Sequence, residues 1–158
     1  FALGVAATTL VGQSLGARRP DLAEKAAVIA ARWAVSLMTT VGFGLALLGG
    51  PITSLFVREA DVIDIGRRLL LILAFAMPAL AVSLTLGGGL RGAGDTRAVL
   101  GIATFGIWCV RLVPAYLFAV AVGFGVPGAW WAAVIDINTR GVLMWLRFRQ
   151  GRWKGIKV

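Results

Sequence analysis

The chain has 158 residues, of which 59% are hydrophobic and 15% are charged, whereas soluble domains carry about 25% charged residues. A soluble domain of this length cannot hide so much apolar surface in one core, so the composition excludes an ordinary soluble fold and indicates a membrane protein. The net charge of +9 does not indicate a nucleic-acid partner, because the cations punctuate apolar runs instead of gathering on one polar face.

Five helices are predicted, in chain order, over residues 1–16, 21–49, 62–90, 97–122 and 127–148, with a basic tail over 149–158. The first is apolar from Phe1 onward, so we expect the chain to begin partway through a larger protein. Pro20 and Asp21 are typical of a helix start, and Gly-Gly-Pro at 49–51 predicts where that helix ends.

The later segments have the length and composition of membrane spans. Residues 69–90 carry no charge, and at about 1.5 Å per residue they can cross a hydrocarbon core of about 30 Å. Residues 98–122 are interrupted only by Arg111, and GFGVPG at 123–128 predicts a turn before the final span. We therefore expect an all-α, polytopic membrane helix bundle embedded in a lipid bilayer.

The stretch GGGLRGAGDTR at residues 87–97 fits the G-x-G-x-x-G pattern of a dinucleotide-binding turn. That motif needs a preceding strand and an acidic residue about 20 positions later. Here membrane-length helices flank it, and no acid lies between Asp95 and Asp136. The chain also contains no His, the commonest general base. We therefore expect no cofactor, no metal site and no enzymatic activity, and interpret Cys109 as a small apolar side chain.

Cations are distributed unequally between the two predicted sides of the membrane. If the loop around Arg18 is cytoplasmic, alternation of the spans puts the 87–97 corner and the tail on the same side. That side collects eleven cations: Arg18, Arg19, Lys25, Arg32, Arg91, Arg97, Arg147, Arg149, Arg152, Lys154 and Lys157. The other side holds Arg58, Arg67 and Arg68. The positive-inside rule therefore predicts four spans after a partial helix and a cytoplasmic C-terminus.

Three charged residues are predicted at membrane depth: Arg111, Asp136 and Arg140. Counted from the 123–128 turn, Arg111 lies about 17 Å deep and Asp136 about 14 Å deep on the antiparallel neighbour. Such charges are costly unless paired or wetted, so we expect them to meet. They either line a cavity within the bundle or respond to protons, or they form an ion pair that fixes two helices. The second interpretation is favoured, because an aspartate flanked by two arginines stays ionised.

The corner formed by Arg91, Gly92, Gly94, Asp95 and Thr96 is interpreted as structural, with a gating role as the alternative. Its glycines allow positive φ and close backbone approach. Asp95 and Thr96 are expected to cap the helix that follows.

Small residues, prolines and tryptophans carry further expectations. Gly12 and Gly16 form a G-x-x-x-G pair that permits close helix approach, although chance also produces this spacing in a glycine-rich chain. Pro78 and Pro114 lie inside predicted spans, where each removes a backbone hydrogen bond and bends its helix. Four tryptophans near span ends are typical of aromatic belts: Trp33, Trp130, Trp131 and Trp153.

Three segments together resemble one family, the multidrug and toxic compound extrusion (MATE) transporters. They are VGQSLGARRPDLAEKAA at 11–27, GGGLRGAGDTR at 87–97 and GVPGAWWAAVIDINTRGVLMWLRFRQGRWK at 125–154. The resemblance implies a partial C-terminal six-helix lobe, from the end of helix eight to helix twelve, of a twelve-helix, two-lobe exporter. The missing N-terminal lobe would belong to the same protein.

The resemblance also implies a function, which is secondary active multidrug efflux by alternating access in the bacterial cytoplasmic (inner) membrane. A proton or sodium ion enters while a small organic, often cationic, molecule leaves. Some members use a carboxylate on the tenth helix, but residues 69–90 contain no acid, which favours a proton coupled through the missing lobe. Bent helices act in this family as hinges, so Pro78 and Pro114 are either hinges or fixed kinks. The alternatives are a lipid-linked oligosaccharide flippase of the same superfamily and a non-transporting membrane scaffold.

Overall fold

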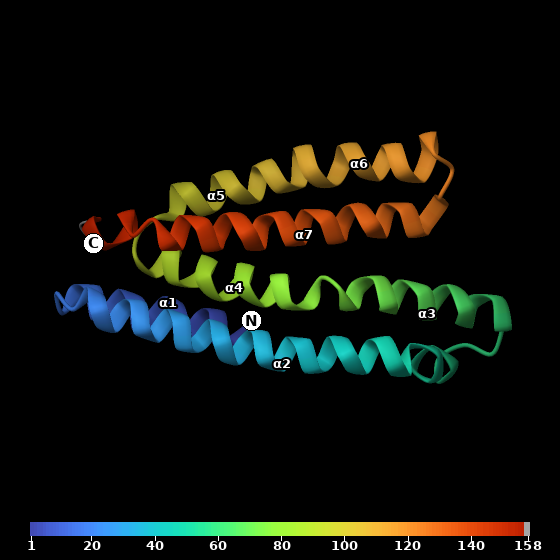
Figure 1. Ribbon diagram of the computed structural model, residues 1–158, viewed down its shortest axis with the longest axis horizontal. Helices are drawn as coiled ribbons and strands as arrows, with labels where there is room; N and C mark the ends of the chain where they lie inside the picture. The colour runs from blue at the N-terminus through green and yellow to red at the C-terminus, as the bar shows by residue number, and fades with distance from the viewer. Residues whose placement is uncertain (157–158) are drawn as a thin grey trace.

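The computed structural model describes residues 1–156, which form an elongated bundle of helices with no strand in that range (Figure 1). The long elements are α1 (Ala2–Gly16), α2 (Pro20–Ser54), α3 (Ala60–Ala74), α4 (Met77–Gly92), α5 (Thr96–Phe105) and α7 (Gly125–Arg149). Between α5 and α7 lie the π-helical stretches η1 (Gly106–Leu112) and η2 (Leu117–Ala121) around the short α6 (Val113–Tyr116), and η3 (Arg152–Gly155) is a closing 3-10 turn. The predicted all-α membrane helix bundle is confirmed.

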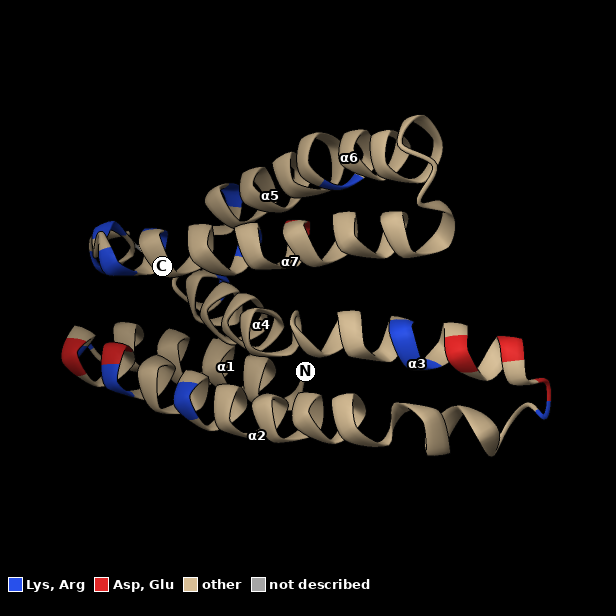
Figure 2. Cartoon of the chain, turned by 45° about the vertical axis from the view of Figure 1, so that its right-hand side comes forward, with Lys and Arg blue, Asp and Glu red and all other residues tan. Residues whose placement is uncertain are grey.

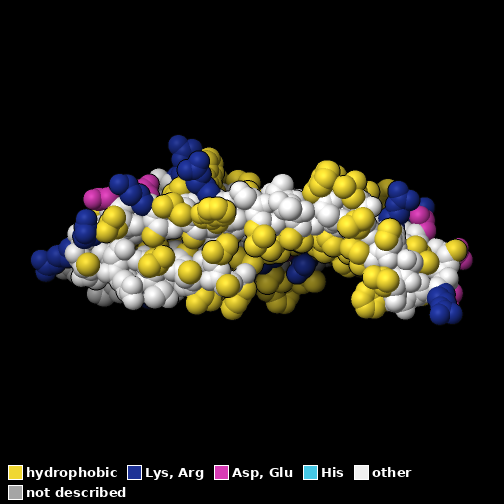
Figure 3. Space-filling view, turned by 90° about the horizontal axis from the view of Figure 1, so that it is seen from below, with side chains coloured by type: hydrophobic (Ala, Val, Ile, Leu, Met, Phe, Trp, Pro, Cys, Tyr) yellow, Lys and Arg dark blue, Asp and Glu magenta, His cyan; other side chains and the backbone are white. Residues whose placement is uncertain are grey.

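Two helices are long and apolar enough to cross a membrane, namely α2 and the continuous helix Thr96–Ala121. The pair α3 and α4 gives a third span if it is counted as one bent unit. Among the described residues, α7 does not join this group, although it has 25 residues. Large apolar side chains are exposed along the bundle, and on the face seen in Figure 3 they cover the middle while charges gather mostly toward the ends. Such a surface requires lipid or further protein to cover it.

The predicted end of the second helix at residues 49–51 is wrong, because α2 continues to Ser54. Gly49 is buried against α3, where an added Cβ would lie 3.4 Å from the Leu70 Cβ, so this glycine serves packing instead of ending the helix. Pro51 lacks the N–H that would donate to the Leu47 carbonyl, yet the helix continues for three residues beyond the proline. In this last turn the Thr53 hydroxyl donates to the Gly49 carbonyl at 2.8 Å.

The predicted helix over residues 62–90 is two helices, α3 and α4, which are bent by 47° at the break between them. Pro78 lies in the first turn of α4, where its missing N–H costs no helical hydrogen bond. Ala76 at the break is fully buried and packs in a small apolar cluster with Ile72 from α3 and Val134 and Ile137 from α7. The bend therefore rests against α7.

The helix around Pro114 is continuous instead of broken, since Thr96–Ala121 forms one candidate span. π-helical turns lie immediately before and after the four-residue α6 that contains the proline. A proline ring clashes with the carbonyl four residues earlier, and the wider π turn removes that clash without a sharp kink.

The first residues of the predicted basic tail are mostly helical and pack against the bundle. Helix α7 reaches Arg149, Gly151 reverses the chain at a φ of 69°, and η3 folds back onto the bundle. Trp153 is 0% exposed, stacks on Phe148 with ring centroids 4.9 Å apart, and donates its indole N–H to the Phe148 carbonyl at 2.9 Å. Trp153 is therefore a core residue, and its assignment to an aromatic belt is wrong. Lys157 and the end of the predicted tail lie outside the described residues.

Helices α1 and α4 cross at very short distance because glycines line their contact. A Cβ added to Gly88 would collide with the Gly4 carbonyl, and one added to Gly92 would collide with the Thr8 carbonyl. The Thr8 hydroxyl donates to the Gly88 carbonyl at 3.0 Å. Of the predicted G-x-x-x-G pair, Gly12 approaches α4 closely, whereas nothing lies within 4 Å of a Cβ on Gly16.

Candidate functional site

The predicted site residues fall into two groups, one at an end of the bundle and one midway along α7. The α1–α2 loop, the α4–α5 corner and the C-terminal segment share one end of the molecule in Figure 1, and many Lys and Arg residues gather there in Figure 2. A buried apolar cluster joins these segments, with Val11, Ala23, Ala93 and Trp153 among its members. The sequence segments that carry the family resemblance therefore meet in space.

The intramembrane cluster is centred on Asp136, whose side chain is 0% exposed. Arg140, one turn later on α7, donates from Nη2 to its Oδ2 at 2.6 Å. Arg111 on η1 approaches the same oxygen with Nε at 3.8 Å, which is an ion pair without a direct hydrogen bond. The structure thus brings together the three residues that the depth argument expects to meet.

Gly106 is the residue of this cluster that the sequence did not reveal. A Cβ at Gly106 would lie 2.5 Å from Asp136 Oδ1 and 2.7 Å from the Arg140 Cδ, so only glycine leaves room for the ion pair. It lies five residues before Arg111, at the first position of η1. A glycine inside an apolar span, close to an arginine in the same span, was the sequence signal that could have indicated a close side-chain approach. Two buried polar atoms of the cluster have no partner among the described atoms, Asp136 Oδ1 and Arg140 Nε.

Arg111 also faces a recess between α3, η1 and α7. This cavity has a volume of about 350 Å³ and is lined by Arg111, Leu73, Trp130 and Ile137 together with small and branched apolar residues of α7. The Arg111 side chain is 42% exposed, whereas Asp136 does not reach the cavity wall. The accessible charge of the cluster is therefore positive and its anion is enclosed.

The corner after α4 contains a second buried aspartate. Asp95 occupies the N-cap position of α5 but makes no side-chain capping hydrogen bond, so the predicted cap is wrong. Instead its Oδ2 accepts a hydrogen bond from Arg147 Nε of α7 at 2.7 Å. Asp95 is 6% exposed, and a cation from another helix compensates its charge better than a weak backbone donor.

The other corner residues have mainly steric roles. Gly94 has a φ of 81°, a value that favours glycine. Gly92 ends α4 against α1, Arg91 is exposed in the last turn of α4, and Thr96 begins α5. Arg147 was expected only as a cytoplasmic cation, because its pairing with a residue 52 positions away leaves no local sequence pattern.

Neither group offers a metal site within the described part of the chain, where no three His, Cys, Asp or Glu side chains cluster. The chemistry of both groups is that of enclosed carboxylates neutralised by arginine. The two ion-pair groups connect α7 to different neighbours. Asp136 of α7 pairs with Arg111 of η1, and Arg147 of α7 pairs with Asp95 of the α4–α5 corner.

Comparison with known proteins identifies the family. The family model described as MatE matches residues 1–117. The chain belongs to the MatE family. This confirms the predicted resemblance to MATE transporters, and the matched range holds α1 to α6 and the start of η2, including the GGGLRGAGDTR corner.

Curated proteins align with nearly the whole chain. A probable multidrug resistance protein NorM from Mannheimia succiniciproducens is 33% identical over 93% of this chain and 32% of its own length. One from Thermotoga maritima is 32% identical over 98% of this chain and 33% of its own length. The multidrug resistance protein NorM of Burkholderia vietnamiensis is 32% identical over 94% of the chain and 33% of its own length. The chain therefore spans about a third of the length of the curated relatives it matches.

Proposed function

We propose that this chain is the C-terminal part of a multidrug efflux transporter that exchanges a proton for a small organic, often cationic, molecule by alternating access. The observation that carries the proposal is the match to MatE together with relatives named multidrug resistance proteins. Because those relatives are about three times as long, export belongs to the complete protein. This chain contributes part of its C-terminal lobe, against a missing N-terminal lobe.

The pairing and the positions of the carboxylates in this chain support a coupling ion that binds outside these helices. Asp136 is enclosed and pairs with two guanidinium groups, so its carboxylate is already engaged within these helices. Asp61 and Asp64 are exposed near the start of α3, and α4 carries no acid at all. A protonatable carboxylate in the missing lobe is the simplest source of proton coupling.

The distribution of charge supports a cytoplasmic C-terminus in the bacterial inner membrane. The α1–α2 loop, the α4–α5 corner and η3 lie at the same end of the bundle, and this end collects most of the cations of the sequence. The opposite end holds Arg58, Arg67 and Arg68 together with three acids, Glu59, Asp61 and Asp64.

The 47° bend before Pro78 supports a hinge for alternating access. It divides a span into two rigid halves and rests on α7 through small apolar contacts, so the halves can reorient without breaking ion pairs. Pro114 lies in a continuous helix with π turns, which favours a fixed shape for that span.

Everted membrane vesicles that contain the complete protein test this function. We expect an imposed proton gradient to drive accumulation of a cationic fluorescent dye, and collapse of the gradient to stop it. Accumulation driven by sodium alone would overturn the proton assignment. No gradient-dependent movement of any of several cationic dyes, with the protein present and folded, would overturn the export function and favour the scaffold.

A further inference from the structure

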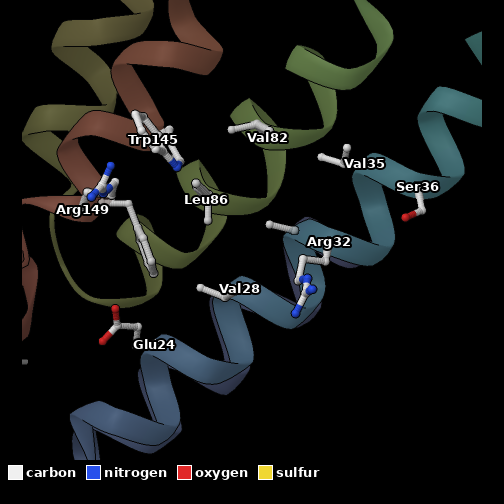
Figure 4. A pocket seen from close by; sticks show the side chains of 11 residues that line it. Glu24, Val28, Arg32, Val35, Ser36, Val82, Leu86, Trp145 and Arg149 are labelled. Atoms are coloured by element: carbon white, nitrogen blue, oxygen red, sulfur yellow. The ribbon is translucent and has the colours of Figure 1, made fainter.

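A pocket lies at the cation-rich end of the molecule, between α2, α4 and α7. It has a volume of about 510 Å³, within the range of about 300–1,000 Å³ found for ligand sites. Figure 4 shows its side chains converging from the three helices. Val28 and Val35 on α2 and Val82 and Leu86 on α4 form apolar walls, and Trp145 on α7 closes one side. It shares no residue with the intramembrane cluster or with the α4–α5 corner.

The polar groups of this pocket are mainly cationic. Its charged lining residues are Glu24, Arg32 and Arg149. Glu24 is neutralised by Lys154, whose Nζ lies 2.5 Å from Oε2. Within residues 1–156 neither arginine forms an ion pair, and the Arg149 guanidinium lies over the Trp145 ring at 4.8 Å from its centroid. The pocket therefore presents two uncompensated guanidinium groups beside an apolar cavity, which complements an anion joined to a hydrocarbon chain.

The depth of these residues matches the boundary between headgroups and hydrocarbon. With 35 residues, α2 is about 52 Å long and exceeds a hydrocarbon core of about 30 Å, so its first turns lie outside that core. Arg32 comes three turns after Pro20, and the neighbouring Trp33 is 69% exposed beside a smaller recess that is also lined by Arg32. An exposed tryptophan beside an arginine is typical of the membrane interface. Val35 on α2 and Val82 on α4 lie farther from the cation-rich end than the two arginines do, toward the middle of the membrane.

We propose that this pocket binds an anionic phospholipid, with its phosphate held by Arg32 and Arg149 and an acyl chain lying along Val35 and Val82. A zwitterionic lipid brings its own cation to a positive pocket and binds less well, and an organic cation is repelled. The site requires only a membrane location and does not depend on drug export.

The test uses the complete protein in vesicles and Trp145 as the internal probe. Bromine atoms on an acyl chain quench tryptophan only at short range, so the difference between wild type and Trp145→Phe isolates the quenching of Trp145. We expect brominated phosphatidylglycerol to quench this component several-fold more strongly than brominated phosphatidylcholine at the same mole fraction. The variant R32Q/R149Q is expected to lose the preference, whereas R97Q, which removes an exposed cation at the same end outside the pocket, keeps it.

A competition measurement on the unaltered protein does not depend on any variant folding. Unlabelled phosphatidylglycerol is expected to restore the tryptophan fluorescence that brominated phosphatidylglycerol quenches, while inorganic phosphate at millimolar concentration does not, which separates a lipid from a free anion. Equal quenching by both lipids, or equal loss of preference in R97Q, would overturn the proposal. Absence of quenching by either lipid would overturn it too, because another part of the protein then fills the pocket. None of these outcomes bears on gradient-driven dye export.

Discussion

Substitution of Asp136 by asparagine tests whether the intramembrane cluster fastens two helices or takes part in transport. The amide keeps the shape of the side chain but removes the charge that faces Arg140 at 2.6 Å and Arg111 at 3.8 Å. Both guanidinium groups then lose their anion, and the pairing between η1 and α7 is lost.

The magnitude follows from the burial of each partner. Removing one member of a fully buried ion pair costs about 3–5 kcal/mol, because the other charge stays enclosed without compensation. Asp136 is 0% exposed but Arg140 is 20% exposed, so Arg140 can reach some solvent. We therefore expect Asp136→Asn to lower the free energy of unfolding by about 3 kcal/mol, the lower end of that range.

The assay is equilibrium unfolding of the complete protein in mixed micelles, with a double-mutant cycle of Asp136→Asn and Arg140→Gln. The cycle is expected to give a coupling energy of about 1–3 kcal/mol. The matched control is Asp64→Asn, since Asp64 pairs with Arg68 at the same i,i+4 spacing and 2.7 Å but on the exposed surface. It is expected to cost less than about 1 kcal/mol.

Dye efflux per folded molecule decides between the two roles. If the cluster is structural, the fraction of Asp136→Asn that folds transports with an unchanged pH dependence. An unchanged free energy of unfolding together with complete loss of proton-driven efflux would refute the structural interpretation.

Three further substitutions test the packing, each by thermal unfolding of the complete protein. Gly92→Ala forces a methyl into α1 and is expected to destabilise by about 1–3 kcal/mol, whereas Gly101→Ala, with open space around it, is neutral or slightly stabilising; equal effects would contradict the close crossing. Trp153→Ala removes a fully buried ring and is expected to cost about 3–5 kcal/mol, while Trp33→Ala costs less than about 1 kcal/mol; a neutral Trp153→Ala would mean that η3 is detached. Arg18→Gly relieves a positive φ of 56° and is expected to stabilise by about 0.5–1 kcal/mol; destabilisation would show that the Arg18 side chain matters more than its backbone.

The existence and order of the helices could be predicted from the sequence because long apolar runs and punctuating glycines and prolines are local signals. The 98–122 run and the start near Pro20 are of this kind. The depth argument for Arg111 and Asp136 also succeeded, because a tight turn and a fixed helical rise together set which residues lie side by side.

The predictions that failed were local interpretations of residues whose contacts lie on another helix. Asp95 precedes the first residue of a helix and therefore resembles a helix cap, but its side chain accepts a hydrogen bond from Arg147 on another helix. Trp153 looks like an interfacial residue in a basic tail, but a single glycine with positive φ returns it to the core. Gly49 looks like a helix stop, but the approach of α3 makes it a packing residue.

The glycine contact between α1 and α4 has a consequence for biogenesis. Its hydrogen bond joins residues 80 positions apart, Thr8 and Gly88, so α1 enters the bilayer well before its partner has been synthesised. During that interval its glycine face meets lipid, which fills a flat backbone surface poorly. Shape matching between these two helices is therefore completed late, when α4 inserts, and a bulky side chain at Gly88 or Gly92 would leave a polypeptide that is fully inserted yet unassembled, a target for membrane quality-control proteases.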